Sequence, residues 1–229
     1  MRNRLVFFLM ALCLASCNDR GGNLLRPTRE TLKHDVAEKF IGKDGIKRLC
    51  ESYLGIKYLD RPEIELELLK NRSKSDLINP DIYASDEAQF GAQVSKAYLA
   101  DVYVKFIDDE FGYGMFAHAD IKNGELIGEY TGLIKASDQV QDKAWSWSYP
   151  KKIYRESLNL QDISLDAKFS GSAVRFVNHS DTPNTEMRRI FLDGMVRTLY
   201  VATKDIACDE QIFVSYGSAY WDKRKKRNT

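Results

Sequence analysis

The fold of this chain is decided by two stretches, Arg175-Phe176-Val177-Asn178-His179-Ser180-Asp181-Thr182-Pro183-Asn184 and Phe213-Val214-Ser215-Tyr216-Gly217. The first places an Asn-His pair ahead of a Pro-Asn turn, and the second is a short apolar strand that ends in Tyr-Gly. An isolated Asn-His pair is typical of a turn. The surrounding residues give the pair its weight, because a motif gains value from the context that it predicts.

A third motif lies upstream. It runs from Phe111-Gly112-Tyr113-Gly114-Met115-Phe116 to Gly124-Glu125-Leu126-Ile127-Gly128-Glu129-Tyr130-Thr131-Gly132. Together the three motifs resemble, in the right order, the core signature of the SET-domain protein lysine methyltransferases. The resemblance covers Asp101 to Trp221, and we expect a SET domain over residues 101–221. It implies a mostly β (α+β) fold, the SET-type β-clip with a C-terminal pseudoknot, in which the strand ending at Tyr216 passes close to Asn178 and His179.

Hydrophobic periodicity agrees with a mostly β domain. From Asp101 apolar residues alternate with a period of two, and turn residues separate the apolar runs. Strands are predicted at 102–107, 114–117, 125–131, 145–149, 158–165, 189–192, 197–202 and 211–215. Gly112-x-Gly114 lacks a third glycine, so a Rossmann dinucleotide site is disfavoured.

Residues 18–100 are predicted to form a tether followed by a helical N-terminal region. Apolar residues at helical spacing run from Leu32 through Phe40 to Leu54, and Gly55 is a plausible stop. Asp60 and Pro62 predict the start of a helix over 64–69. Ser85 opens another helix that carries Phe90, Val94 and Leu99 on one side. This region contains no constellation of catalytic residue types, so it is interpreted as structural, as a lid or as a partner-facing surface.

The resemblance implies the chemistry of methyl transfer from S-adenosyl-L-methionine to a lysine amine of a protein. Such a transfer depends chiefly on orientation. Tyr216 is the expected catalytic residue, because a free phenol has a pKa of about 10 and its hydroxyl stays protonated at neutral pH. The resemblance assigns the cofactor to Gly112, Tyr113, Gly114, Arg175, Asn178, His179, Tyr216 and Trp221. Glycines permit close backbone approach to a ligand, although a simple strand corner explains the same two glycines.

Two positions depart from the family pattern. Val214 stands where many relatives have Phe or Tyr, and Met187 stands where a compensating tyrosine is found in others. The number of methyl groups added therefore stays open. Trp145, Trp147 and Tyr149 alternate within the insert 134–165, and either a lysine channel or an ordinary β core face explains this stripe.

The N-terminus is typical of a targeting segment. Arg2 and Arg4 precede the apolar run Leu5–Leu14, which is too short to span a bilayer. Leu14-Ala15-Ser16-Cys17 resembles the lipobox of bacterial lipoproteins, so residues 1–17 are interpreted as a signal peptide with a lipidated Cys17. The alternatives are a plain hydrophobic leader and a true start further along, at Met10. The expected address is thus export or membrane anchoring, with delivery into a host cell or cytoplasmic retention left open.

With Cys13 and Cys17 in the leader region, only Cys50 and Cys208 remain. These are too few and too far apart for a zinc site, so no metal is expected. The two thiols could pair in an oxidising compartment, but two isolated buried thiols are the favoured interpretation.

The chain has 229 residues and a formal net charge of +1, and this average hides a local imbalance. Lys223-Arg224-Lys225-Lys226-Arg227 forms a basic tail within 222–229, which is typical either of a polyanion-binding or nuclear-import contact or of a solvated terminus. The expected partner is a lysine-bearing substrate such as a histone or another basic protein. The alternative function is a catalytically silent SET-like module that is anchored to a membrane and binds a peptide.

Overall fold

Short strands dominate the computed structural model, which describes residues 38–65, 73, 76–77, 79–141, 145–149, 163–217 and 220. The strands are β1 (Phe40–Ile41), β2 (Lys57–Tyr58), β3 (Glu63–Ile64), β4 (Val102–Asp108), β5 (Gly112–Ala117), β6 (Leu126–Tyr130), β7 (Leu133–Ala136), β8 (Ser146–Ser148), β9 (Ile163–Asp166), β10 (Ser170–Gly171), β11 (Asn178–His179), β12 (Thr185–Leu192), β13 (Met195–Ala202) and β14 (Phe213–Val214). The helices are α2 (Gly42–Arg48), the π-helical turn η2 (Leu49–Tyr53), the 3₁₀ turns η5 (Pro80–Tyr83), η6 (Ser137–Gln139) and η9 (Ala173–Phe176), and α3 (Ala84–Ser95). The mostly β fold class is confirmed. The expected signal peptide, the predicted tether at 18–27, the predicted helical residues 28–37 and 66–69, Trp221 and the basic tail lie outside the described residues.

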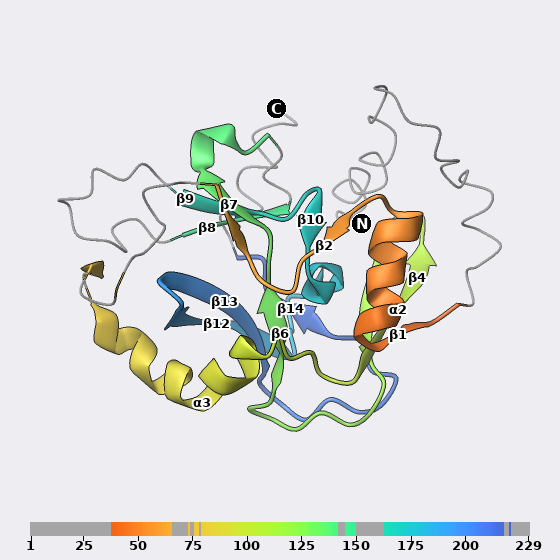
Figure 1. The fold of residues 1–229 in the computed structure, drawn as a ribbon. Coiled ribbons are helices and arrows are strands. Elements are labelled where there is room, and N and C mark those ends of the chain that lie inside the picture. The colour runs from red at the N-terminus through yellow and green to blue at the C-terminus, as the bar shows by residue number, and fades with distance from the viewer. Residues whose placement is uncertain are drawn as a thin grey trace, which may run out of the picture.

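The strands form several small sheets (Figure 1). Their orders are β1-β4-β5, β12-β13-β6, β3-β7-β9-β8, β10-β2 and β11-β14. The last two are parallel pairs of strands far apart in sequence, and parallel pairing always needs such a crossover. Figure 1 shows α2 beside β4 and α3 beside β12.

The strand predictions from alternating hydrophobicity are confirmed over most of the domain. The main difference is a hairpin that is longer than expected, because β12 begins at Thr185 and β13 at Met195. Asp193 and Gly194, with φ of 51° and 80°, form the turn between them. Two positive φ values in a row match the twist of a tight hairpin, which is why the strands can pair right up to the turn. Residues 158–162 of the predicted strand 158–165 lie outside the described part.

The helical prediction for the N-terminal region is wrong at two places. Phe40 lies in β1 and pairs with Val104, and Ile64 lies in β3 beside β7. The amides of Glu63 and Glu65 donate to the carbonyls of Gly132 and Ile134, both 2.9 Å away. A free sheet edge offers acceptors that helical spacing in the sequence does not reveal, and tertiary context overrides a weak propensity.

Other N-terminal predictions hold. The chain turns at Gly55 with φ of +64°, and α3 carries Phe90 and Val94 in a small apolar cluster with β6, β12 and β13. Leu99 was expected on the same helix, but α3 ends at Ser95 and Leu99 instead bridges to Gly128. No helix in the described part of the chain is long and apolar enough to cross a membrane.

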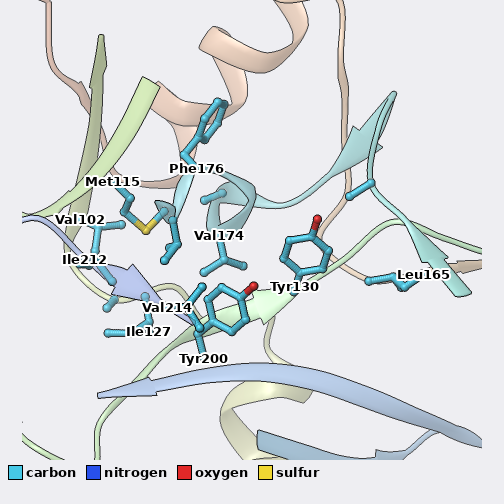
Figure 2. Close-up of a cluster of buried hydrophobic side chains, with 14 of the residues drawn as sticks. Val102, Met115, Ile127, Tyr130, Leu165, Val174, Phe176, Tyr200, Ile212 and Val214 are labelled. Carbon is cyan, nitrogen blue, oxygen red and sulfur yellow. The ribbon is translucent and has the colours of Figure 1, made fainter. Parts of the chain in front are cut away.

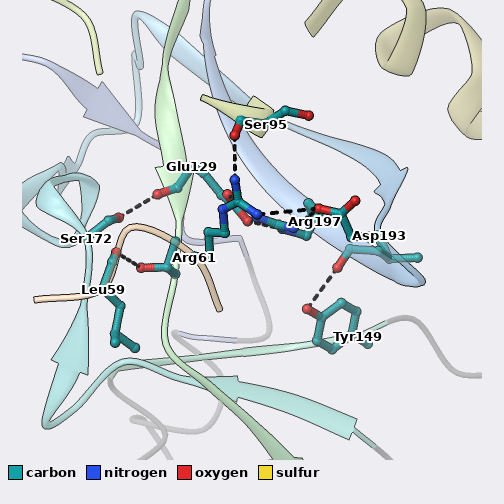
Figure 3. Close-up of polar contacts among 10 residues, drawn as sticks. Leu59, Arg61, Ser95, Glu129, Tyr149, Ser172, Asp193 and Arg197 are labelled. Atoms are coloured by element: carbon teal, nitrogen blue, oxygen red, sulfur yellow. Dashed lines mark hydrogen bonds and ion pairs between the residues drawn. The ribbon is translucent and has the colours of Figure 1, made fainter. Parts of the chain in front are cut away.

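A buried ion pair joins β6 to β13 (Figure 3). The Arg197 guanidinium donates to both carboxylate oxygens of Glu129, at 2.5 and 2.8 Å. Asp193 lies 3.7 Å from Arg197 and 3.9 Å from Arg61, whose guanidinium also donates to the carbonyl of Ser95. The pair therefore extends into a polar network that ties the N-terminal segment to the hairpin.

The two cysteines outside the leader are both free thiols. Cys50 is buried, as expected, whereas Cys208 is exposed, so the expectation of two buried thiols is wrong for Cys208. The reason is its place in the loop between Ile206 and Ile212, where its amide donates to an Asp120 carboxylate oxygen at the surface.

Gly132, between β6 and β7, is expected to tolerate no side chain. A Cβ built there would lie 2.5 Å from the carbonyl oxygen of Asp166, a backbone atom that cannot move aside cheaply. Gly132→Ala should lower the free energy of unfolding by about 1–3 kcal/mol in urea denaturation. The matched control is Gly91→Ala in α3, where the new Cβ meets its nearest atom at 3.8 Å and should stabilise by about 0.5–1 kcal/mol. Equal stabilities for the two variants would contradict the steric argument.

Candidate functional site

The parallel pair of β11 and β14 brings together the Asn178-His179 motif and the strand that ends in Tyr216-Gly217. Asn178 faces Phe213 and His179 faces Val214 across the pair, and the amide of Ser180 donates to the carbonyl of Val214 at 3.2 Å. A pairing of this kind places the end of β14 beside the Asn-His motif. The predicted approach of these two distant segments is confirmed.

Tyr216 is fixed to the Asn-His segment at both its backbone and its side chain. Its amide donates to Nδ1 of His179 at 3.1 Å, across 37 positions of sequence. Its hydroxyl donates to the carbonyl of Val177 at 3.1 Å. The rings of Tyr216 and His179 have centroids 5.4 Å apart, and the ring of Tyr220 contacts that of Tyr216 edge-on at 4.8 Å. The phenol therefore has one defined orientation in the fold.

The hydrogen bonds of His179 fix its tautomer. Because Nδ1 accepts the amide proton of Tyr216, the ring proton sits on Nε2, which lies 3.2 Å from Oδ1 of Asp181. The imidazole thus positions the backbone of Tyr216 and lies beside the phenol ring.

Asn178 connects this pair to β5. Its side-chain amide donates to the carbonyl of Tyr113 at 3.2 Å, and the ring of Tyr113 packs edge-on against Phe176 at 6.0 Å. The motif around Gly112 and Gly114 thereby lies next to Asn178, which stands beside His179 in the segment that Tyr216 contacts.

The two glycines of this motif have different surroundings. Gly112 has φ of +68°, and a Cβ built on it would meet no atom within 4 Å. A Cβ on Gly114 would lie 2.5 Å from Ile107 and 2.8 Å from Gln211. Packing therefore explains Gly114, whereas the open side of Gly112 allows a bound group to approach the backbone.

Asn184 is a scaffold residue that the sequence analysis treated only as part of a turn. Its Oδ1 accepts the amide proton of Phe213 at 2.7 Å, and its Nδ2 donates to the carbonyl of Gln211 at 2.8 Å. The hydroxyl of Thr185 donates to the carbonyl of Phe213 at 2.6 Å. These bonds hold β14 in place, and the only sequence signal for them was the Pro-Asn pair itself.

Arg175 extends toward the predicted insert. Its guanidinium carbon lies 4.8 Å from the centroid of the Trp145 ring and 5.8 Å from that of Phe176, and Nη2 donates to the carbonyl of Lys168 at 3.2 Å. Burial lowers the pKa of this guanidinium. The cofactor role that was expected for Arg175 stays a prediction, and the structure shows its charge packed against Trp145.

The comparisons with known proteins agree with this geometry. The family model of the SET domain matches residues 112–217, from the glycine that borders open space to the glycine after Tyr216. Residues 112–217 form a SET domain.

Relatives share this domain within much longer chains. The variant-silencing SET domain-containing protein of Plasmodium falciparum is 31% identical over 137 residues, covering 57% of this chain and 5% of the relative. The histone-lysine N-methyltransferase ASHH3 of Arabidopsis thaliana is 30% identical over 114 residues, covering 47% of this chain and 30% of the relative. The SET domain is thus the part in common, and the chain spans less than a third of either relative.

A solved structure supports the fold. ATXR5 in complex with histone H3.1 superimposes with a TM-score of 0.55 over 75% of this chain and 85% of that chain, at 19% sequence identity. At this identity the likeness shows the fold alone, and it agrees with a SET domain built from small sheets.

An aromatic cluster lies next to the paired strands of the SET domain (Figure 2). The rings of Tyr130 and Tyr200 are 5.9 Å apart, and Trp147 meets Tyr130 edge-on at 6.2 Å. The Tyr130 hydroxyl donates to the carbonyl of Trp145 at 3.2 Å. Burial raises the pKa of both Tyr130 and Tyr200, and Tyr216 lies within electrostatic range of each. No pattern in the sequence marks these two phenols as neighbours of Tyr216.

The stripe of Trp145, Trp147 and Tyr149 is divided by the structure. Trp147 belongs to the aromatic cluster and Trp145 carries the guanidinium of Arg175. Tyr149 is buried, and its hydroxyl donates to the carbonyl of Val196 at 3.0 Å, so it is a core residue. Val214 is buried, and Met187 pairs with Tyr200 across the hairpin. Within the described residues, no group of three or more His, Cys, Asp and Glu side chains is arranged to hold a metal.

Proposed function

We propose that the protein is an S-adenosyl-L-methionine-dependent protein-lysine N-methyltransferase. The observation that carries the proposal is the double attachment of Tyr216 to the Asn178-His179 segment within a SET domain. Relatives that share the domain include a histone-lysine N-methyltransferase. Methyl transfer demands orientation above all, and a phenol that is held at both its hydroxyl and its backbone supplies it.

The residues at the site fit the proposed cofactor. The open side of Gly112 leaves the backbone accessible, and Asn178 bonds to the carbonyl of the neighbouring Tyr113. Gly112, Tyr113, Asn178 and His179 would hold the cofactor, with Trp221 completing the set. When bound, S-adenosyl-L-methionine supplies an activated methyl group on a positively charged sulfur. The expected cofactor contacts of Gly114 and Arg175 are not part of this proposal, because Gly114 is packed against Ile107 and Gln211 and the guanidinium of Arg175 lies on the Trp145 ring.

Tyr216 is assigned the central role in the transfer. Its hydroxyl donates its proton to the carbonyl of Val177, and a phenol oxygen is also a hydrogen-bond acceptor for an incoming lysine amine. The phenol can therefore orient the amine while the acceptor loses its proton to water. The rings of Tyr130 and Tyr200 are buried within electrostatic range of Tyr216, and we expect them to exclude water from that side of the phenol.

The substrate class that we propose is a lysine-bearing basic protein, such as a histone. The localisation that we propose from residues 1–17 is export with a lipid on Cys17. The basic tail at 223–227 is proposed to contact a polyanion. Because S-adenosyl-L-methionine is made in the cytoplasm, an exported form would act after delivery into a cell that provides it.

A transfer assay tests the proposal. The purified protein is incubated with S-adenosyl-L-methionine labelled on its methyl group and with histones or a basic DNA-binding protein, and label in the protein band is measured. We expect label on lysine. Background labelling of every protein tried, together with no measurable heat of cofactor binding by calorimetry, would instead favour a silent peptide-binding module. Cofactor binding without transfer would show that the substrate class is wrong.

A further inference from the structure

Arg175 is a buried cation with few hydrogen-bond partners. The residue is 6% exposed, and its Nε and Nη1 have no hydrogen-bond partner within the described part of the chain. Only Nη2 donates, to the carbonyl of Lys168. A guanidinium is not deprotonated in proteins, so the positive charge persists despite its burial. The burial of such a charge is unfavourable in free energy unless the charge is paired. Arg175 is therefore a candidate for a role beyond packing.

The titratable groups around Arg175 do not neutralise it. Those within electrostatic range are the thiol of Cys50, the phenol of Tyr130 and the carboxylate of Asp166. Burial raises the pKa of Cys50 to about 11 and raises that of Tyr130, so both are neutral at physiological pH. Asp166 is ion-paired with Lys135 at 3.1 Å, and that pair carries no net charge. Among the residues that the structure describes, the neighbourhood of Arg175 is therefore left with one excess positive charge.

The charge of Arg175 lies beside Trp145, and Arg175 stands two residues before Val177, whose carbonyl accepts the hydroxyl of Tyr216. The guanidinium lies over the Trp145 ring, and the carbonyl of Trp145 accepts a hydrogen bond from the hydroxyl of Tyr130. Tyr130 is in turn within electrostatic range of Tyr216. Figure 2 shows Tyr130 and Tyr200 in the same buried cluster as Val174, the residue before Arg175. The interior of this aromatic cluster has a low dielectric constant, so the field of a fixed charge is screened less there than in water.

An amine held among aromatic rings faces two opposing influences. Ring faces attract an ammonium ion, which would keep a lysine protonated and unable to accept a methyl group. A like charge nearby disfavours the ammonium form. In this protein one aromatic face, that of Trp145, is already occupied by a cation.

We infer, resting on the proposed function, that Arg175 acts through its field to favour the neutral amine of a substrate lysine at Tyr216. The lysine ammonium gives its proton to water, and its nitrogen keeps the electron pair that forms the new N–C bond. Arg175 touches neither reacting atom in this account. It is a positioning residue whose contribution is electrostatic.

The test is the pH dependence of kcat for a lysine peptide, measured on the full chain with saturating peptide and saturating S-adenosyl-L-methionine, because kcat reports the pKa values of groups in the bound complex. Arg175→Met removes the charge and keeps an apolar stem of similar length. The acid limb of the kcat profile should move upward by about one pH unit, so that kcat falls about tenfold at neutral pH and approaches the wild-type value at high pH. Arg175→Gln, which can still donate to Lys168, is a second neutral variant should Arg175→Met fold poorly. A loss of the same factor at every pH would overturn the inference and leave Arg175 a packing residue.

Two controls separate the electrostatic effect from other causes. Arg188→Met removes a cation that pairs with Asp86 of α3, on the opposite face of the hairpin from Tyr200, and should leave the pH midpoint where it is. A peptide in which S-(2-aminoethyl)cysteine replaces the lysine carries a less basic amine, and it should restore most of the activity lost by Arg175→Met at neutral pH. Calorimetry with the cofactor alone should give the same affinity for wild type and variant.

The outcomes also distinguish this inference from the proposed function. Absence of transfer by the wild-type protein at every pH would overturn the proposed function and the inference with it. Transfer by the wild-type protein with an unmoved midpoint in both Arg175 variants would overturn the inference alone.

Discussion

Replacement of Tyr216 by Phe should reduce methyl transfer by about 10²-fold or more while the fold remains intact. The substitution removes one oxygen, which bonds to the carbonyl of Val177 at 3.1 Å, and keeps the ring that packs against His179 and Tyr220. The backbone bond from the amide of residue 216 to His179 also persists, because it does not involve the side chain. The measurement is kcat at saturating substrate and cofactor, with thermal unfolding recorded for the same preparation.

A matched control is Tyr103→Phe. That variant also loses a phenol oxygen that donates one hydrogen bond, here to Asp209 at 2.7 Å, in a part of the chain away from Tyr216. Its stability should fall by a similar amount, about 1 kcal/mol, while its activity stays at the wild-type level. If Tyr216→Phe and Tyr103→Phe keep the same activity, Tyr216 has no part in the chemistry and the proposed function loses its main support.

The second large effect concerns stability and comes from Arg197. Arg197→Met leaves the Glu129 carboxylate buried without its partner, and both side chains are only 5% exposed. Breaking a buried pair by removing one member costs about 3–5 kcal/mol. Urea denaturation at neutral pH should show this loss as a lower midpoint with an unchanged slope. The double variant Glu129→Gln with Arg197→Met removes both charges and should recover a large part of the loss.

The loss in Arg197→Met should depend on pH in a defined direction. Burial raises the pKa of Glu129, and the hydrogen bonds from Arg197 oppose that rise. Without Arg197 the folded-state pKa of Glu129 rises further above its unfolded value, so the folded state binds the proton more tightly than the unfolded state does. A group of this kind favours folding at low pH and loses that contribution as pH rises through the folded-state pKa. The deficit relative to wild type should therefore shrink as pH falls from neutrality, and a deficit that grew on acidification would contradict the account.

Much of the domain could be predicted because its information is local. Alternation of apolar residues located β4, β5, β6 and β13 within a few positions, since each of these strands buries one or both faces in a continuous core. The Asn-His and Tyr-Gly motifs predicted which two segments would meet. The hydrogen bonds from Tyr216 to His179 and Val177 agree with that prediction.

What could not be predicted depends on partners distant in sequence. Phe40 and Ile64 have neighbours typical of a helix, and only the exposed edges of β4 and β7 turn them into strands. In the sequence, Tyr200 is one of several apolar residues in a strand of alternating hydrophobicity, and no neighbour distinguishes it. Its closeness to Tyr130 follows from the register of β13 on β6, which no local pattern encodes. The same holds for Asn184, whose side chain supports a strand that comes much later in the chain.

The parallel pairing of β11 with β14 has a consequence for the order of events during folding. Closure of the intervening hairpin of β12 and β13 shortens the loop between β11 and β14, so we expect this pair to form after the hairpin. The pair of β2 and β10 likewise joins strands that are far apart in the sequence. Contacts between remote parts of a polypeptide form slowly, because loop entropy is lost before any contact is gained. The phenol of Tyr216 therefore gains its orientation among the last steps of refolding, and ligand affinity should return with the final kinetic phase rather than with early collapse.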